Sequence, residues 1–302
     1  MNILITGGAG FIGTFTKKLL KMEGHKIVIL DNLQSGSREN LRDDEVFIEG
    51  DIRDSTITQK LLPYDIEVII HLAAQTSVPI SIKDPLNDLS INIEGTIKVL
   101  QVAKELGIKK FIFASSAAVY GDNESLPIQE EAVLQPTSPY GISKMSAEKY
   151  IESFCKLHDI TYIIFRFANV FGPKQSKDGE GGVIKIFFDC MMKGVPPQIF
   201  GDGTQTRDFI FVEDIARAHV AALKEVPSGI YNVSTNTEIS VNELINWIKE
   251  TTQVELSPIY TEERAGDIYK SCLDNSKIKT NLGWEPVYSV LEGIKETYDS
   301  LK

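Results

Sequence analysis

The stretch NILITGGAGFIG, residues 2–13, decides the fold class of this chain. Its first five residues are mostly apolar, as is typical of a buried strand, and the glycines at positions 7, 10 and 13 follow the pattern Gly-x-x-Gly-x-x-Gly. Glycine at these positions permits a tight turn, a close approach of the backbone to a ligand, and close packing of a helix on a strand. The stretch therefore predicts a strand, a glycine-rich turn and the start of a helix.

Strand-like and helix-like segments alternate beyond this stretch. Runs rich in Ile, Val and Phe predict strands at residues 2–6, 26–30, 46–49, 67–71 and 110–114. Helical periodicity occurs at residues 11–23, 55–62 and 86–106. A helix at 137–158 and a strand at 161–166 continue the pattern. This alternation predicts an α/β fold with a Rossmann-like, doubly wound parallel sheet.

The pattern weakens after residue 169, where Gly, Pro and Asp interrupt short segments. We expect a dinucleotide-binding domain over residues 1–167 and a smaller α/β substrate-binding lobe over residues 168–302. A helix at 212–223 and a strand at 229–233 form another unit, so the segment at about 206–236 is expected to pack back on the main sheet.

Composition excludes several classes of protein. The net charge of −11 argues against a general nucleic-acid binder. Three scattered cysteines and four histidines show no metal-ligand spacing, so we expect no metal. Met1 leads directly into a predicted strand, and no apolar run has membrane length. These features predict a cytoplasmic enzyme with no membrane segment.

The glycine-rich turn is typical of a dinucleotide site. The helix that follows it would offer unpaired N–H groups and its positive dipole end to a pyrophosphate. Asp31 ends the second predicted strand, where a carboxylate accepts hydrogen bonds from a ribose 2′-hydroxyl and repels a 2′-phosphate. NAD is therefore favoured over NADP, although an Asp at this place also serves as a plain turn residue. Asp51 and Ile52 are candidates to clamp the adenine, and Leu72–Ala74 offers small side chains beside the cofactor.

A second constellation lies in SSAAVYG, residues 115–121, and YGISK, residues 140–144. Tyr140 and Lys144 are four residues apart, which places an ammonium beside a phenol on one helical face. A tyrosine that acts as a base near pH 7 needs its pKa lowered by about three units, or roughly 4 kcal/mol. An adjacent lysine and an oxidised nicotinamide can supply this, and a serine hydroxyl alongside can pass on the proton. The alternative is a structural Tyr-x-x-x-Lys helix pair.

Together these motifs resemble the extended short-chain dehydrogenase/reductase superfamily, in its NAD-dependent epimerase/dehydratase family and the UDP-glucose 4-epimerase type. The resemblance covers the whole chain and rests on residues 7–13, 31–33, 50–52, 71–74, 115–121, 140–144, 166–173, 201–208 and 264–267. It implies that Ser116, Tyr140 and Lys144 are the catalytic set, with Tyr120 a separate residue. It also implies a tightly bound NAD held by Gly7, Gly10, Phe11, Ile12, Gly13, Asp31, Asn32, Asp51, Ile52, Leu72, Ala73, Ala74, Tyr140 and Lys144.

The resemblance further implies a UDP-sugar substrate bound by the second lobe. It assigns the diphosphate to Asn169 and to two arginines, with Asp267 at the ribose. Turn capping by the asparagine and surface salt bridges of the arginines are the alternatives. The full set of expected substrate contacts is Ser116, Asn169, Val183, Phe200, Arg207, Arg264, Asp267 and Ser271.

The expected reaction is inversion at C4 through transient oxidation and re-reduction. Related dehydratases and decarboxylases carry an acidic residue where this chain has Ala117 and Ala118, which disfavours loss of water. A UDP-glucuronate epimerase, another dehydratase or reductase, and an NAD-binding regulatory protein remain alternatives. The small Ser271 leaves room for an N-acetyl group, unless neighbouring Tyr269 occupies that place. Relatives pair the helix at 86–106 with the helix that starts at 137, so we expect a homodimer with a four-helix bundle.

Overall fold

The computed structural model describes residues 1–175, 182–263 and 268–302, and its centre is a seven-stranded parallel sheet. The strand order is β11-β6-β5-β4-β1-β2-β3. The strands are β1 (Asn2–Thr6), β2 (Lys26–Asp31), β3 (Val46–Glu49), β4 (Val68–His71), β5 (Lys110–Ser116), β6 (Thr161–Phe167) and β11 (Gly229–Val233). Since the chain order reverses between β1 and β4, the carboxyl ends of these two strands define the crevice where such sheets bind ligands.

Helices cover both faces of this sheet, as the sequence predicts. On one face, α1 (Phe11–Met22) packs against α8 (Val212–Ala222), and Ile3 and Ile5 of β1 join their core. On the other face lie α2 (Ile57–Leu61), α5 (Gly95–Glu105) and α6 (Pro139–Leu157), whose core includes Leu4. Successive residues of a strand point to opposite faces, so one apolar strand supplies both cores. The doubly wound prediction is confirmed.

The helix predicted at 86–106 is present, but it contains a π-helical turn. After the separate short helix α3 (Val78–Lys83), α4 (Pro85–Leu89), a π-helical turn at Ser90–Glu94 and α5 follow one another without interruption. The wider turn carries Asn92 inward, where its side chain donates to the backbone oxygen of Gln75 and to Ser143 Oγ. Partners that are distant in sequence therefore stabilise a departure that local periodicity does not reveal.

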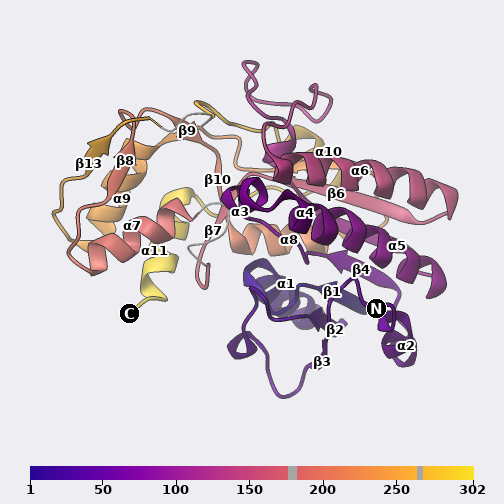
Figure 1. Ribbon diagram of the computed structural model, residues 1–302. Coiled ribbons are helices and arrows are strands. Elements are labelled where there is room, and N and C mark those ends of the chain that lie inside the picture. The colour runs from indigo at the N-terminus through magenta and orange to yellow at the C-terminus, as the bar shows by residue number, and fades with distance from the viewer. Residues whose placement is uncertain (176–181, 264–267) are drawn as a thin grey trace.

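The second half of the chain forms a smaller lobe beyond one end of the sheet, where α7, α9, β8 and β13 gather in Figure 1. Its helices are α7 (Val183–Met192), α9 (Val241–Thr252) and α11 (Val290–Asp299), whereas α10 (Ser276–Leu282) packs against β11 of the main sheet (Figure 1). Its strand pairs are β7 (Asn169–Phe171) with β10 (Phe209–Phe211), β8 (Gln198–Phe200) with β13 (Ile259–Thr261), and β9 (Thr206–Arg207) with β12 (Ile239–Ser240). Between them, α8 and β11 return to the main sheet, where β11 pairs with β6. The division into domains at residues 167 and 168 stays a prediction.

Other predicted boundaries differ by a few residues. The strand expected at 110–114 continues to Ser116, and the helix expected at 55–62 is shortened to α2, after which Leu62–Tyr64 forms a 3₁₀ turn around Pro63. Single 3₁₀ turns also occur at Arg38–Asn40 and Ala117–Val119. Within the described ranges, every helix is too short or too polar to cross a membrane.

Candidate active site

The glycine-rich turn packs so tightly that side chains are excluded from it. Gly7 has φ +72°, and a Cβ there would lie 2.7 Å from the backbone nitrogen of Ala73. A Cβ on Gly13 would lie 2.5 Å from the carbonyl oxygen of Gly7. These contacts bring the segment after β4 against the turn after β1. Leu72–Ala74 therefore lies beside the turn, as expected.

The start of α1 suits a pyrophosphate. Its N-cap is Gly10, and no side chain caps the helix, so Phe11 and Ile12 begin it with their backbone N–H groups directed outward. Asp31 lies at the end of neighbouring β2 and is buried. Its two carboxylate oxygens accept from the backbone nitrogens of Ala9, at 3.0 Å, and Leu33, at 2.8 Å.

Those two bonds leave acceptor capacity on the Asp31 carboxylate, which has about four lone-pair sites. The residue thus serves as the turn residue considered above and still has capacity to bind ribose hydroxyls. An uncapped helix start, a turn that excludes Cβ atoms and an acidic strand end together fit an NAD cofactor.

Asp51, Asn32 and Arg53 form a cluster at the next strand ends. Arg53 donates to both carboxylate oxygens of Asp51, at 2.8 and 2.7 Å, and Asn32 donates to the second at 3.0 Å. Hydrogen bonds from Arg53 lower the pKa of Asp51 to about 2. Ile52 is buried beside them. The cluster orders the segments expected to border the adenine.

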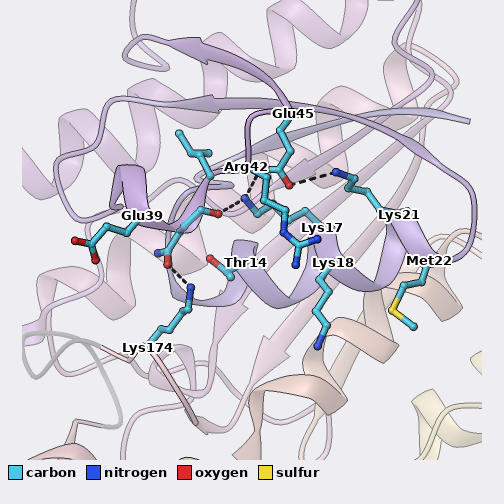
Figure 2. A pocket seen from close by; sticks show the side chains of 11 residues that line it. Thr14, Lys17, Lys18, Lys21, Met22, Glu39, Arg42, Glu45 and Lys174 are labelled. Atoms are coloured by element: carbon cyan, nitrogen blue, oxygen red, sulfur yellow. Dashed lines mark hydrogen bonds and ion pairs between the residues drawn. The ribbon is translucent and has the colours of Figure 1, made fainter. Parts of the chain in front are cut away.

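A cavity of about 340 Å³ lies along α1 and the loop after β2 (Figure 2). Lys17, Lys18 and Lys21 contribute to its lining, and among the described residues that line it none belongs to the predicted site. Lys17 and Lys174 both donate to Asn40, while the Asn40 side chain donates to the backbone oxygen of Ala9 at 2.9 Å. These bonds fasten the loop to the glycine-rich turn.

The structure brings the predicted catalytic residues to the end of β5. Ser116 closes this strand, and its Oγ accepts from the backbone nitrogen of Ala118 at 3.1 Å. Tyr140 and Lys144 lie on buried turns of α6. The start of α6 packs closely on the turn that follows Ser116, since a Cβ on Gly141 would lie 2.5 Å from the carbonyl oxygen of Ala118.

Lys144 links this helix to the strand. Its Nζ donates to the backbone oxygen of Ala114 at 2.8 Å and lies 5.9 Å from the centre of the Tyr140 ring. The ammonium is thus held near the phenol, as the i,i+4 spacing predicts. Tyr120 differs, since its hydroxyl donates to Asn232 at 2.6 Å and burial raises its pKa to about 12.

Sequence reasoning missed the buried polar residues that hold the start of α6. Ser143 donates to the backbone oxygen of Tyr140 at 2.9 Å and accepts from Asn92 at 3.0 Å. Asn92 also bonds Asp88 and the backbone of Gln75. The helical spacing of Ser143 is visible in the sequence, but its partner in the π-helical turn is not.

The second lobe brings together two of the expected diphosphate ligands. Asn169 in β7 pairs with Phe209 in β10, and its side chain donates to the backbone oxygen of Asp208 at 3.0 Å. Arg207 is the adjacent residue, in β9. Asn169 thus makes the turn contact named as the alternative, and it does so next to the arginine.

The other expected substrate residues are distributed over this lobe. Val183 starts α7 and Phe200 ends β8, both half-buried. Ser271 is buried, whereas Tyr269 is exposed and hydrogen-bonds Thr204 at 2.6 Å. Arg264 and Asp267 lie outside the described residues.

Asp208 fastens three segments of this lobe, a role the sequence did not predict. Its carboxylate accepts from Thr235, Asn236 and Leu273, at 2.8 to 3.3 Å. Burial raises the pKa of Asp208 to about 6, against these hydrogen bonds, which lower it. The neighbours of Arg207 and Ser271 are thereby tied together.

The structure has a doubly wound parallel sheet, a glycine-rich turn before a helix without a side-chain cap, and a Ser-Tyr-Lys set. These features define the class of dinucleotide-dependent enzymes with a Rossmann-like fold. The model of the NAD dependent epimerase/dehydratase family matches residues 3–234, and this chain belongs to that family. It is 38% identical over 306 residues to the UDP-glucose 4-epimerase of Mycolicibacterium smegmatis, covering 99% of this chain and 98% of the relative.

Two solved structures resemble the chain over its length. The UDP-glucose 4-epimerase of Thermotoga maritima, solved with UDP-glucose, is 40% identical with a TM-score of 0.96, covering 100% of this chain and 98% of that one. The UDP-N-acetylglucosamine 4-epimerase of Methanobrevibacter ruminantium, in complex with UDP-N-acetylmuramic acid, is 35% identical with a TM-score of 0.94, covering 99% and 97%. The expected superfamily is confirmed.

Proposed function

We propose that this chain is an NAD-dependent 4-epimerase that interconverts UDP-glucose and UDP-galactose. The observation that carries the proposal is the meeting of Ser116, Tyr140 and Lys144 at the end of β5, beside the strands that bear the glycine-rich turn and Asp31. Full-length similarity to proteins named UDP-glucose 4-epimerase supports the choice of reaction.

The residues divide the work by their chemistry. Tyr140 takes the proton of the sugar C4 hydroxyl and later returns it, and Ser116 hydrogen-bonds the same oxygen. Lys144, held by the backbone of Ala114, stabilises the phenolate electrostatically. A bound NAD would supply the hydride acceptor and donor for C4. The 4-keto sugar turns over in the pocket between the two hydride transfers, and the configuration at C4 is thereby inverted.

Binding of the UDP portion is assigned to the second lobe. Asn169, which bonds the backbone of the residue after Arg207, and Arg207 itself suit a diphosphate, while Val183 and Phe200 are assigned to the base. Arg264 and Asp267 complete the proposed set. Because Ser271 is small and Tyr269 is engaged with Thr204, we extend the substrates to UDP-GlcNAc and UDP-GalNAc.

The test is NMR of UDP-galactose and of UDP-GalNAc incubated separately with the purified protein and no added NAD. Appearance of the 4-epimer supports both the reaction and a retained cofactor. Release of water would show that the protein is a dehydratase, and net reduction of the sugar would show that it is a reductase. Conversion of UDP-glucuronate alone would restrict it to that sugar, and NAD binding without any turnover would support a regulatory protein.

A homodimer is the proposed assembly, through α4 to α6 and their neighbour α3. Large apolar side chains are exposed on these contacting helices, namely Ile80, Ile82, Leu86, Leu89, Ile142 and Tyr150. Such a surface is typical of an isologous interface. We place the enzyme in the cytoplasm, as expected from its sequence.

Sedimentation velocity tests the dimer. Leu86→Asp combined with Tyr150→Asp should yield monomers, whereas Val133→Asp, at an exposed site of a loop, should leave the dimer intact. A wild-type monomer, or a double variant that still dimerises, would contradict the proposed interface.

A further inference from the structure

A buried ion pair joins α6, the helix that carries Tyr140 and Lys144, to β6, the strand beside β5. Glu148 of α6 and Arg166 of β6 are 0% and 2% exposed. Arg166 donates from Nε to Oε1 of Glu148 at 3.0 Å and from Nη2 to Oε2 at 2.7 Å. This forked geometry fixes orientation as well as distance, because both groups are planar and rigid.

The pair also reaches the strand that ends in Ser116. Oε1 of Glu148 accepts from the hydroxyl of Ser115, the preceding residue, at 2.5 Å. Glu148 lies one helical turn beyond Lys144 and two beyond Tyr140, so the three share a face of α6. The carboxylate of Glu148, which is carried by the same helix as Tyr140 and Lys144, therefore hydrogen-bonds side chains of both β5 and β6.

Arg166 extends the contacts to the turn that follows Ser116. Its Nη1 donates to the hydroxyl of Tyr120 and to the backbone oxygen of Glu130, both at 2.9 Å. Four of the five Arg166 N–H groups thus have acceptors, and the Tyr120 hydroxyl in turn donates to Asn232. The elevated pKa of Tyr120, caused by burial, keeps this phenol neutral.

A buried ion pair contributes little net stability, since the cost of removing charges from water offsets their attraction. Such a pair fixes geometry, and here it links α6 to β6 and, through the hydrogen bond from Ser115, to β5. We propose that Glu148 and Arg166 are positioning residues that hold Ser116 in register with Tyr140 and Lys144. The inference rests on the proposed function, because the reaction is what this spacing serves.

The experiment compares the holoenzyme with Ser115→Ala, Arg166→Lys and Glu148→Gln. Each should lower kcat for UDP-galactose by about 10-fold to 100-fold, the effect of a displacement of about 1 Å, with KM changed less than about threefold. Ser115→Ala is the mildest change and keeps the test valid if the others fail to fold. Asp214→Asn is the matched control, since this buried carboxylate holds the backbone of Val287 and Tyr288 instead.

Coupling to Ser116 separates positioning from mere stability. In a Ser116→Ala background, Arg166→Lys should lower kcat by a smaller factor than it does in the wild type, because the Ser116 hydroxyl, one of the groups that it positions, is gone. Full additivity of the two losses would overturn the inference, as would unchanged kcat in Ser115→Ala and Arg166→Lys. Equal loss of kcat in Asp214→Asn would also overturn it.

A second measurement does not depend on turnover of any sugar. The absorbance change on ionisation of Tyr140, taken as the difference from Tyr140→Phe, gives the pKa of this residue in the NAD-bound protein. Arg166→Lys should raise that pKa by moving Lys144 and Ser116 away from the phenol. Failure of wild-type protein to epimerise would refute the proposed function alone, whereas an unchanged pKa in Arg166→Lys would refute the positioning role.

Discussion

Gly13→Ala is predicted to weaken NAD binding and stability together. The new Cβ would lie 2.5 Å from the carbonyl oxygen of Gly7 and 2.7 Å from the Cα of Gly8. Both neighbours are backbone atoms, so the glycine-rich turn itself must shift. This turn holds Ala9, which hydrogen-bonds Asp31, so the cofactor-binding edge of the sheet shifts with it.

The magnitudes follow from two opposing effects. Overpacking costs about 1–3 kcal/mol, while alanine is favoured over glycine in a helix by about 1 kcal/mol. A net loss of about 1 kcal/mol lowers the Tm by about 2 °C, since unfolding 302 residues has an entropy of about 0.6 kcal/mol per kelvin. Loss of one backbone bond to a charged phosphate costs about 1.5–3 kcal/mol, which raises the Kd for NAD by about 10-fold to 100-fold.

The assay measures NAD by calorimetric titration into nucleotide-free protein and Tm by scanning calorimetry. Gly293→Ala is the matched control. Gly293 lies in helix α11, and a Cβ there would be similarly crowded, 2.7 Å from the ring of Phe171. It should lower the Tm and leave the Kd for NAD unchanged. Wild-type affinity in Gly13→Ala would refute the argument, and equal weakening of NAD binding by both variants would show that it reflects general destabilisation.

Three further predictions address the site and the core. Tyr140→Phe should retain NAD and lower kcat by about 10²-fold to 10⁴-fold in a UDP-galactose assay; a smaller loss would remove Tyr140 as the base. Ser271→Tyr should abolish turnover of UDP-GalNAc and spare that of UDP-galactose, and equal rates on both sugars would contradict the pocket assignment. Burial lowers the pKa of His219 to about 3, so the unfolded chain takes up its proton first and stability falls as the pH drops below about 6.5. Wild type should lose about 2 kcal/mol more than His219→Met between pH 7 and pH 5 by urea unfolding. The raised pKa of Asp208 increases stability as the pH falls from about 6 to about 4, but Asp208 is present in both proteins, so its effect cancels in this comparison. Identical pH dependence of stability in the two proteins would show that His219 is not buried as a neutral ring.

The sequence was most informative where a structural requirement is local. Gly7 and Gly13 must be glycine because of atoms within the turn and its neighbouring strand end, and their spacing alone predicts this. The spacing of Tyr140 and Lys144 likewise places both on one helical face. Alternating apolar segments predict the doubly wound sheet, because each buried strand must present apolar side chains to both faces.

Local patterns failed where distant residues decide the geometry. The helix expected at 86–106 contains a π-helical turn that local periodicity did not predict, and there Asn92 bonds Gln75 and Ser143. Asn169 and Arg207 become neighbours only through the pairing of β7 with β10, and Asp208 acquires its partners from loops far along the chain. No periodicity encodes such pairs.

By itself, the sequence determined the alternation of strands and helices, the glycine-rich turn and the shared helical face of Tyr140 and Lys144, since each depends on a local pattern. Only the tertiary structure decided how the Ser-Tyr-Lys set is held. Ser115, Glu148 and Arg166 come from three elements, and parallel pairing of β5 with β6 is what brings them together. A side chain's partners across a sheet depend on strand order and register, which are long-range properties of the folded chain.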